Sequence, residues 1–441
     1  MTTREPNGRL RALYTETGWT QLQLAQQTNR VGTERGLPCR YQGPSVHQWL
    51  NGLLPRESVR PLIVEALSRR LRRPLTLADA GFPEPSGPSG TVGTVDGLIN
   101  LGSADSTPGR RAVVASAALF SVALAIPDWP DIVGRMEAAS SAQSRRIGPP
   151  DVDMVTDMTD RLGLLYDDFG GRHARPMAAA FLVNTVAPYL RADGSEDVRR
   201  RMMSAAAFLS YLTGWMAVDE GLHGLAQRYY VKGLELAGAS ADHMTYCHIL
   251  RGMSVQAVDL GHGAPALRLA VAASSASPSS GPRLTAFMAG QQAHAYAVAG
   301  DQRGAFRAIR ETEQAMDRAT STRAFGGYSP STLAYHTAQV RYALGDVAGS
   351  VESLRAHFRA RDEMDSRVSR LRFSAMLAER QLQMGHLDAA CATWGMVLDE
   401  HPSIHSGRVD RAVAGIRQLL RPHLANPSAR EIYDRSRLAV A

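Results

Sequence analysis

Apolar residues recur at helical spacing along most of the chain, and the strict alternation of apolar and polar positions that marks a half-buried strand is almost absent. Near the N-terminus, Val46, Trp49 and Leu50 recur three and four residues apart. From Arg110 onward, Ala- and Leu-rich segments follow one another between Gly, Pro or Asp breaks. The pattern predicts an all-α protein.

Two short helices are predicted close together near the N-terminus. The first runs from Thr20, which can cap it, to Gln27. Its apolar positions, expected to face a core, are Leu22, Leu24 and Ala25. The second begins at Pro44, a residue suited to a first helical turn, and ends at Asn51 and Gly52.

The outward face of the second helix carries hydrogen-bonding side chains. Ser45, His47 and Gln48 lie between its apolar positions. Such groups contact base edges and phosphates when a helix lies in a major groove. The pair is therefore typical of a helix-turn-helix, and double-stranded DNA is the first partner that we expect.

Charge is concentrated in the same part of the chain. The first 82 residues hold 12 arginines and six acidic residues, a balance of +6, whereas the whole chain carries +7. A basic head on a nearly neutral body favours phosphate binding. The arginines nearest the second helix in sequence are Arg30, Arg35, Arg40, Arg56 and Arg60. The later run from Arg69 to Arg73 is explained equally well by favourable charge at a helix C-terminus.

Residues 7 to 83 resemble the XRE family, the Cro/C1-type helix-turn-helix regulators. The residues that carry the resemblance are Thr20-Gln21, Leu24-Ala25 and the run Ser45-Val46-x-x-Trp49-x-x-Gly52. The resemblance implies that Gln21 and Ser45 hold phosphates and that Gln48 reads a base. Together with the charge pattern, it leads us to expect DNA contacts from Gln21, Arg40, Ser45, His47, Gln48 and Arg56.

The segment departs from the family pattern at two points. Leu50 stands where many members carry a Glu before the closing Asn-Gly. The turn between the two helices, normally a few residues long, is expected to run from Thr28 to Tyr41 and contains two glycines and a proline. A turn of that length would change the angle at which the second helix docks on DNA.

A change of composition separates this head from the rest of the chain. Residues 83–109 concentrate Pro, Gly, Ser and Thr, with few large apolar groups, and predict a flexible tether. We therefore expect a DNA-binding domain over residues 1–82, the tether, and a helical body over residues 110–441. A chain of 441 residues, 44% hydrophobic and 21% charged, is long and apolar enough for two or three folded domains.

The body repeats. Glycines that can end a helix stand 40, 39, 45 and 40 residues apart, at Gly221, Gly261, Gly300, Gly345 and Gly385. Five positions after each glycine comes a small residue, as close helix packing requires: Ala226, Ala266, Ala305, Ser350 and Ala390. The arrangement resembles tetratricopeptide (TPR) hairpins, although the intervals exceed the ~34 residues of an ideal repeat. We expect a TPR-like α-solenoid with a concave binding face.

The first helix of each hairpin in such a solenoid lines the concave side. Counting back from the turn glycines places nine residues on or near it: Tyr211, Trp215, His248, Arg251, His294, Tyr335, Gln339, Arg372 and Glu379. They combine aromatic faces with hydrogen-bonding groups, which suits a peptide or a polar small molecule. The alternative is that Tyr211 and Trp215 only pack between repeats.

Other chemistry finds little support in the sequence. Asp219, Glu220 and His223 fall at an inter-helix turn, where polar residues are expected, and no second His cluster accompanies them. The single lysine, Lys232, follows Val231 and cannot form a phosphate-binding Gly-Lys loop. The most apolar run, Ala112–Ile126, is too short for a membrane span, and no signal peptide opens the chain. We expect a cytoplasmic protein without a metal, a cofactor or enzymatic activity.

A helix-turn-helix head with a TPR-like body resembles bacterial regulators in which a repeat domain senses a peptide or another signal and alters DNA binding. Members from high-GC bacteria are associated with development and secondary metabolism, and the near absence of lysine fits such a genome. We expect a transcription regulator that binds DNA as a homodimer and responds to a ligand held by its body. The alternative is a DNA-localised scaffold whose body recruits a protein.

Overall fold

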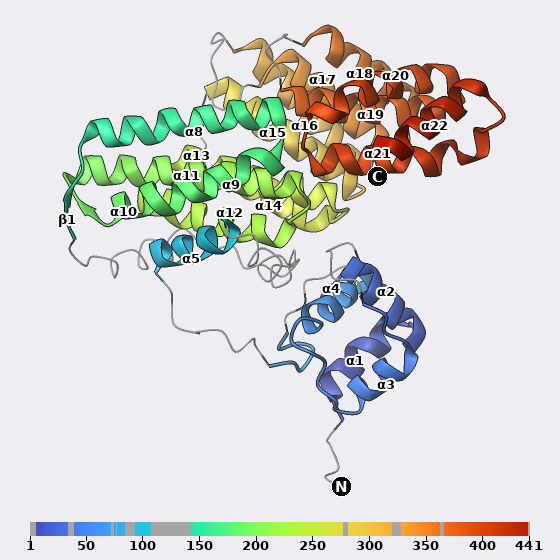
Figure 1. Cartoon of the computed structure of the whole chain (residues 1–441), viewed down its shortest axis with the longest axis horizontal. Coiled ribbons are helices and arrows are strands. Elements are labelled where there is room, and N and C mark those ends of the chain that lie inside the picture. The colour runs from blue at the N-terminus through green and yellow to red at the C-terminus, as the bar shows by residue number, and fades with distance from the viewer. Residues whose placement is uncertain are drawn as a thin grey trace.

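The computed structural model of the chain describes residues 6–33, 39–71, 75, 77–83, 93–106, 143–276, 281–319, 328–361 and 366–439. These residues are almost entirely helical (Figure 1). Their only strands are β1 (Gln143–Arg146) and β2 (Ala192–Asp193), which pair in parallel. No helix among them has the length and apolar character needed to cross a membrane. The prediction of an all-α fold is confirmed.

Four helices form the head, drawn in blue in Figure 1: α1 (Gly8–Thr17), α2 (Gln21–Thr33), α3 (Gly43–Leu50) and α4 (Arg60–Leu71). Every one of them contributes to a shared small core, whose members include Leu10, Leu24, Val46, Trp49, Ile63 and Phe82. Burial of these side chains is what fixes the four helices relative to one another.

The start of α2 is capped as the sequence predicts. The Gln23 backbone N–H donates to Thr20 Oγ1 (3.2 Å), and the Thr20 N–H donates to Gln23 Oε1 (2.8 Å), which is a reciprocal capping box. The expectation that Leu22 faces the core is wrong, because its side chain is 53% exposed. It stands two residues from the buried Leu24, which places it on the opposite side of the helix.

The turn between α2 and α3 is shorter than the expected Thr28–Tyr41, because α2 continues to Thr33. Val31 is buried and extends the apolar stripe of the helix. The Asn29 side chain then fixes the far end of the turn, since it donates to the Tyr41 carbonyl and accepts from the Tyr41 N–H, both at 2.8 Å. Residues 34–38, Arg35 among them, lie outside the described residues.

The segment expected to be a flexible tether, residues 83–109, contains a helix, α5 (Thr94–Ser106). Leu98 and Leu101 of α5 are buried where it packs against α9 and α12 of the body. Gly and Ser give this segment the composition of a linker, but its apolar residues stand three positions apart and form a helical stripe. Among the described residues, α5 therefore packs as part of the body, ahead of the expected boundary at 110.

α8 (Pro149–Phe169) and α9 (Gly171–Phe181) precede a π-helical turn (Leu182–Val186) and α10 (Ala187–Leu190). Six helical hairpins follow: α11 (Glu196–Asp219) with α12 (His223–Ala239), α13 (His243–Asp259) with α14 (Gly263–Ser275), α15 (Gly281–Val298) with α16 (Gln302–Asp317), α17 (Pro330–Ala343) with α18 (Val347–Arg359), α19 (Arg367–Gln383) with α20 (Leu387–Glu400), and α21 (Gly407–Leu420) with α22 (Pro427–Ala439). Neighbouring hairpins pack in sequence order, as in a solenoid.

Five of the six hairpins turn at the glycines that the sequence predicts. All five adopt left-handed φ angles between +77° and +88°: Gly221, Gly261, Gly300, Gly345 and Gly385. Residues with a Cβ atom rarely adopt such angles, and a helix that ends there turns sharply. The small residues five positions later are fully buried in every case: Ala226, Ala266, Ala305, Ser350 and Ala390.

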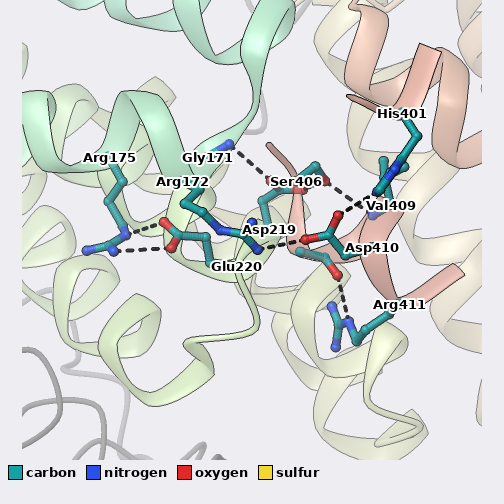
Figure 2. A network of polar contacts seen from close by, with 11 residues as sticks. Gly171, Arg172, Arg175, Asp219, Glu220, His401, Ser406, Val409, Asp410 and Arg411 are labelled. Atoms are coloured by element: carbon teal, nitrogen blue, oxygen red, sulfur yellow. Dashed lines mark hydrogen bonds and ion pairs between the residues drawn. The ribbon is translucent and has the colours of Figure 1, made fainter. Parts of the chain in front are cut away.

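The start of the sixth hairpin meets the end of α11 (Figure 2), and α19 of the fifth hairpin packs against α8, so the solenoid closes on itself. Asp219, at the end of α11, accepts hydrogen bonds from the Gly171 N–H (3.1 Å) and from the Ser406 hydroxyl (2.7 Å). Beside it, Arg172 donates to Asp410 (2.7 Å). We call these contacts between α9, α11 and α21 the seam. The first helices of the hairpins consequently surround a central space.

A buried arginine joins α5, α9 and α11 close to the seam. Arg175 of α9 forms ion pairs with Asp105 of α5 and with Glu220, whose Oε1 lies 2.6 Å from the arginine Nε. The Tyr229 hydroxyl donates to Asp105 as well (3.0 Å). The Arg175 side chain is only 2% exposed, so these charges compensate one another away from water.

Arg175→Met is expected to lower the free energy of unfolding by about 3 to 5 kcal/mol, because it leaves the buried Asp105 and the partly buried Glu220 without their cation. Arg172→Met on the same helix is the matched control. Its side chain is 55% exposed, so its loss should cost less than about 1 kcal/mol. Urea denaturation of the full chain measures both, and equal costs would contradict the assignment.

Candidate functional site

The N-termini of α2 and α3 adjoin on the head. Gly43, which starts α3, faces Gln21, which starts α2, so closely that a methyl group on Gly43 would lie 3.8 Å from the Gln21 Cβ. Gln21 and Ser45 are half-buried at this edge. The first turn of each helix leaves backbone N–H groups without helical partners. The adjoining helix N-termini suit the binding of a phosphate group, and phosphate binding is the role expected for both side chains.

The exposed face of α3 presents His47 and Gln48. The Asn51 amide bonds the His47 Nε2 (2.8 Å), and Arg11 donates to Asn51 Oδ1 (2.8 Å), so α1 orients the histidine through Asn51. The other two residues expected to contact DNA, both exposed and on the segments before and after α3, are Arg40 and Arg56.

A cavity of about 230 Å³ lies at the centre of the closed solenoid. Its walls come mainly from α8 and from the first helix of each hairpin, as expected for the concave side. One lining residue from each of these seven helices is Tyr166, Trp215, Arg251, His294, Tyr335, Arg372 and Arg408. Five of these seven are among the residues that the sequence places on a ligand-binding surface.

Four expected ligand-binding residues do not line this cavity. Tyr211 and His248 pack edge to face against each other, with ring centroids 4.4 Å apart. Gln339 accepts a hydrogen bond from Arg380, and Glu379 lies beside that arginine in sequence. Each of the four stands three, four or seven residues from a lining residue of its own helix. The helical period therefore predicted which face of each helix points inward, but not how far along that face the cavity extends.

One carboxylate and two guanidinium groups meet at the cavity wall. Asp259, at the end of α13, pairs with Arg372 (3.0 Å) and with Arg408 (2.9 Å). Burial acts to raise the pKa of Asp259, but the two arginines outweigh it and hold that pKa below its usual value. Arg408 also lies over the Trp215 ring, 4.8 Å from its centre. Two positive charges thus share one negative charge.

Arg251 lines the cavity without such a partner. Its Nε donates to the Phe287 carbonyl (3.1 Å), and its guanidinium carbon lies 3.7 Å from the centre of the Phe287 ring. Among the described residues no carboxylate lies within ion-pair distance of it, although it is only 9% exposed. Burial lowers the pKa of Arg251, because the charged form loses its hydration.

Aromatic rings and neutral imidazoles complete the wall. Tyr335 and Phe373 stack with centroids 4.2 Å apart and an interplanar angle of 22°. Burial lowers the pKa of His294 to about 4, and the pKa of His336 is lowered for the same reason. Both imidazoles are therefore neutral at pH 7 and can each donate one hydrogen bond and accept another.

Most lining residues were not expected from the sequence, and three of them, Arg408, Tyr166 and Phe373, show why. Arg408 belongs to the sixth hairpin, whose helices are joined through a 3-10 turn (Arg421–His423) instead of a glycine, so that counting glycines stopped at Gly385. Tyr166 lies in α8, upstream of the first recognised repeat. Phe373 directly follows Arg372, and two consecutive helical residues can both face a broad cavity.

The polar residues weighed as metal ligands have structural partners. Asp219 belongs to the seam, and Glu220 pairs with Arg175. The His223 Nδ1 lies 3.4 Å from the Gln256 side-chain nitrogen. Within the described ranges, no group of three His, Cys, Asp or Glu residues is placed to hold a metal ion.

The lowered pKa values of the buried histidines determine how the free energy of unfolding depends on pH. Burial lowers the pKa of His248 to about 3 and that of His294 to about 4, whereas an unfolded histidine titrates near 6.5. Each therefore contributes stability above pH 6.5 and loses it as the pH falls toward the folded value, by about 1.4 kcal/mol per pH unit. Between pH 6 and pH 4, the free energy of unfolding of His248→Phe should therefore fall with decreasing pH less steeply than that of the unaltered chain, by about 1.4 kcal/mol per pH unit. An unchanged slope in urea titrations would mean that His248 is protonated in the folded chain.

The comparison with known proteins concerns the head. A family model described as the SP15 N-terminal domain matches residues 10–83, which span nearly all of the four head helices. No curated protein matches the chain.

Proposed function

We propose that the protein is a DNA-binding transcription regulator whose helical body holds a controlling ligand. The observation that carries the proposal is the exposed face of α3, with His47 and Gln48 beside the adjoining N-termini of α2 and α3. Such a face fits the major groove, and the helix N-termini beside it fit the flanking phosphates. The balance of +6 over residues 1–82 supplies the long-range attraction.

The side chains of the head divide into two roles under this proposal. Gln48 reads a base edge, and His47, oriented by Asn51, makes a second polar contact in the groove. The residues that hold phosphates and set the position of the head on the duplex are Gln21, Arg40, Ser45 and Arg56. Sequence preference then comes from α3, and overall affinity from its surroundings.

A contact between head and body offers a path for control. His262, at the start of α14, lies 3.4 Å from Glu65 of α4, which also accepts a hydrogen bond from Arg69 (2.9 Å). His262 comes three residues after Asp259, which holds two arginines of the cavity wall. Figure 1 shows α3 on the side of the head away from the body, so this contact leaves the DNA-binding face open. A ligand that moves the end of α13 would thus act on α4.

Gln48→Ala is expected to cost about 1 to 3 kcal/mol of discrimination between a specific site and random DNA, because base-edge hydrogen bonds are lost. Arg40→Ala should weaken binding to both DNAs about equally and flatten the salt dependence, since it removes a phosphate contact. Titrations of the full chain at several salt concentrations, on a site found by genome-wide mapping, measure both effects. Equal losses for Gln48→Ala on the two DNAs would remove its reading role, and salt-independent binding would contradict the proposal itself.

The proposed regulator acts as a homodimer formed through its body. One helix-turn-helix covers few base pairs, and two heads on one duplex gain affinity through effective concentration. The full chain is expected to sediment as a dimer at micromolar concentration and to protect two half-sites. A monomer that protects a single half-site would contradict this part of the proposal.

The alternative function is a scaffold that recruits a protein to DNA. A groove between α18, α19 and α20, lined in part by Phe358, Leu377 and the 59% exposed Met396, favours it. A stable complex with a protein, together with DNA affinity that no small molecule changes, would support the scaffold over the sensor.

A further inference from the structure

Positive charge exceeds negative charge at the central cavity. Arg251, Arg361, Arg372, Arg408 and Asp219 line it, and Asp259 lies beside two of these arginines. Asp259 is shared by two of the arginines, and Asp219 accepts its hydrogen bonds from the seam. Arg251 donates to a carbonyl and lies over an aromatic ring, and it pairs with no carboxylate in the part of the chain that the structure describes.

A buried cation without a counter-charge makes a folded protein less stable, because water no longer solvates it. The contrast with Arg175 is direct, since that side chain is also buried but faces two carboxylates. An uncompensated arginine that lines a cavity is therefore expected where a ligand provides the missing charge.

We infer that the cavity binds a small anion, a carboxylate or phosphate attached to a planar group, an inference that rests on the proposed sensing role of the body. Arg251 and Arg372 hold the anionic group, and guanidinium groups suit both kinds of oxyanion. The stacked Tyr335 and Phe373 pack against the planar part. His294, which is neutral, donates a further hydrogen bond without adding charge.

The shape of the site favours a small molecule over a peptide. An extended peptide needs a groove that is open along its length, whereas the seam brings the last hairpin back to the first and closes this one. The volume of about 230 Å³ is smaller than the ~300–1,000 Å³ of usual ligand pockets. A compact anion fills such a space, and its charge replaces the counter-ion that Arg251 lacks.

The binding test uses the full chain and matched pairs of probes. Benzoate, phenylacetate and phenyl phosphate are compared with benzamide, phenylacetamide and phenol, respectively, by calorimetry and by thermal unfolding. The anions are expected to bind and raise Tm, while their neutral counterparts do not. Arg251→Met should weaken anion binding at least about tenfold, because a charged hydrogen bond is lost, whereas Arg307→Met, at an exposed site on α16, should leave it unchanged. Equal binding of neutral probes, or of Arg251→Met and the unaltered chain, would overturn the inference, as would no binding by any anion.

A second measurement needs no ligand. In anion-free buffer, Arg251→Met is expected to raise Tm, because it removes an uncompensated buried charge while keeping an apolar contact with Phe287. A lowered Tm would identify Arg251 as a structural residue and overturn the inference. DNA titrations separate this failure from a failure of the proposed function. A chain that binds DNA but no anion would contradict only the inference about the cavity. An unaltered chain that does not bind DNA would contradict the proposed function of the head.

Discussion

Asp219 holds the two ends of the body together, and the central cavity depends on that contact. Its carboxylate accepts one hydrogen bond from α9 and one from the residue that caps α21, so a single buried group connects three helices. Burial raises the pKa of Asp219, while Arg408 and the two hydrogen bonds oppose that rise. Together with the Arg172–Asp410 pair and the packing of α8 against α19, this contact closes the solenoid and brings Arg408 over the Trp215 ring.

Buried arginines serve two purposes in the body. Arg175 faces the carboxylates of Asp105 and Glu220 and fastens α5 to the solenoid, so its charge is neutralised inside the protein. Arg251 has comparable burial and an aromatic contact, but no carboxylate among the described residues compensates it. The first arrangement is complete in the free protein, whereas the second is completed only by something from outside.

Local rules predicted the hairpins well. A glycine such as Gly345 ends a helix because it can adopt positive φ, and that property can be read from one residue. Helical period then assigned Arg251, His294 and Tyr335 to the inner face. In the head, the cap at Thr20 and the outward position of Gln48 followed from the same short-range patterns.

Contacts between distant segments escaped prediction. The bond from Ser406 to Asp219 joins residues 187 positions apart, and no local pattern encodes it. Closure of the solenoid, and with it the position of Arg408 in the cavity wall, followed only from the structure. The helix α5 escaped for a different reason, because its stability comes from burial of Leu98 and Leu101 on the body and not from its own composition.

The seam also determines when the cavity can exist. Hairpins of an open solenoid fold against their neighbours and can form as they leave the ribosome, one after another. Here the wall that Arg408 completes is missing until α21 has been synthesised and has packed against α9 and α11. A truncated or partly unfolded body would keep many of its hairpins and yet lack the site. Occupancy of the cavity thus reports an intact chain as well as the presence of a ligand.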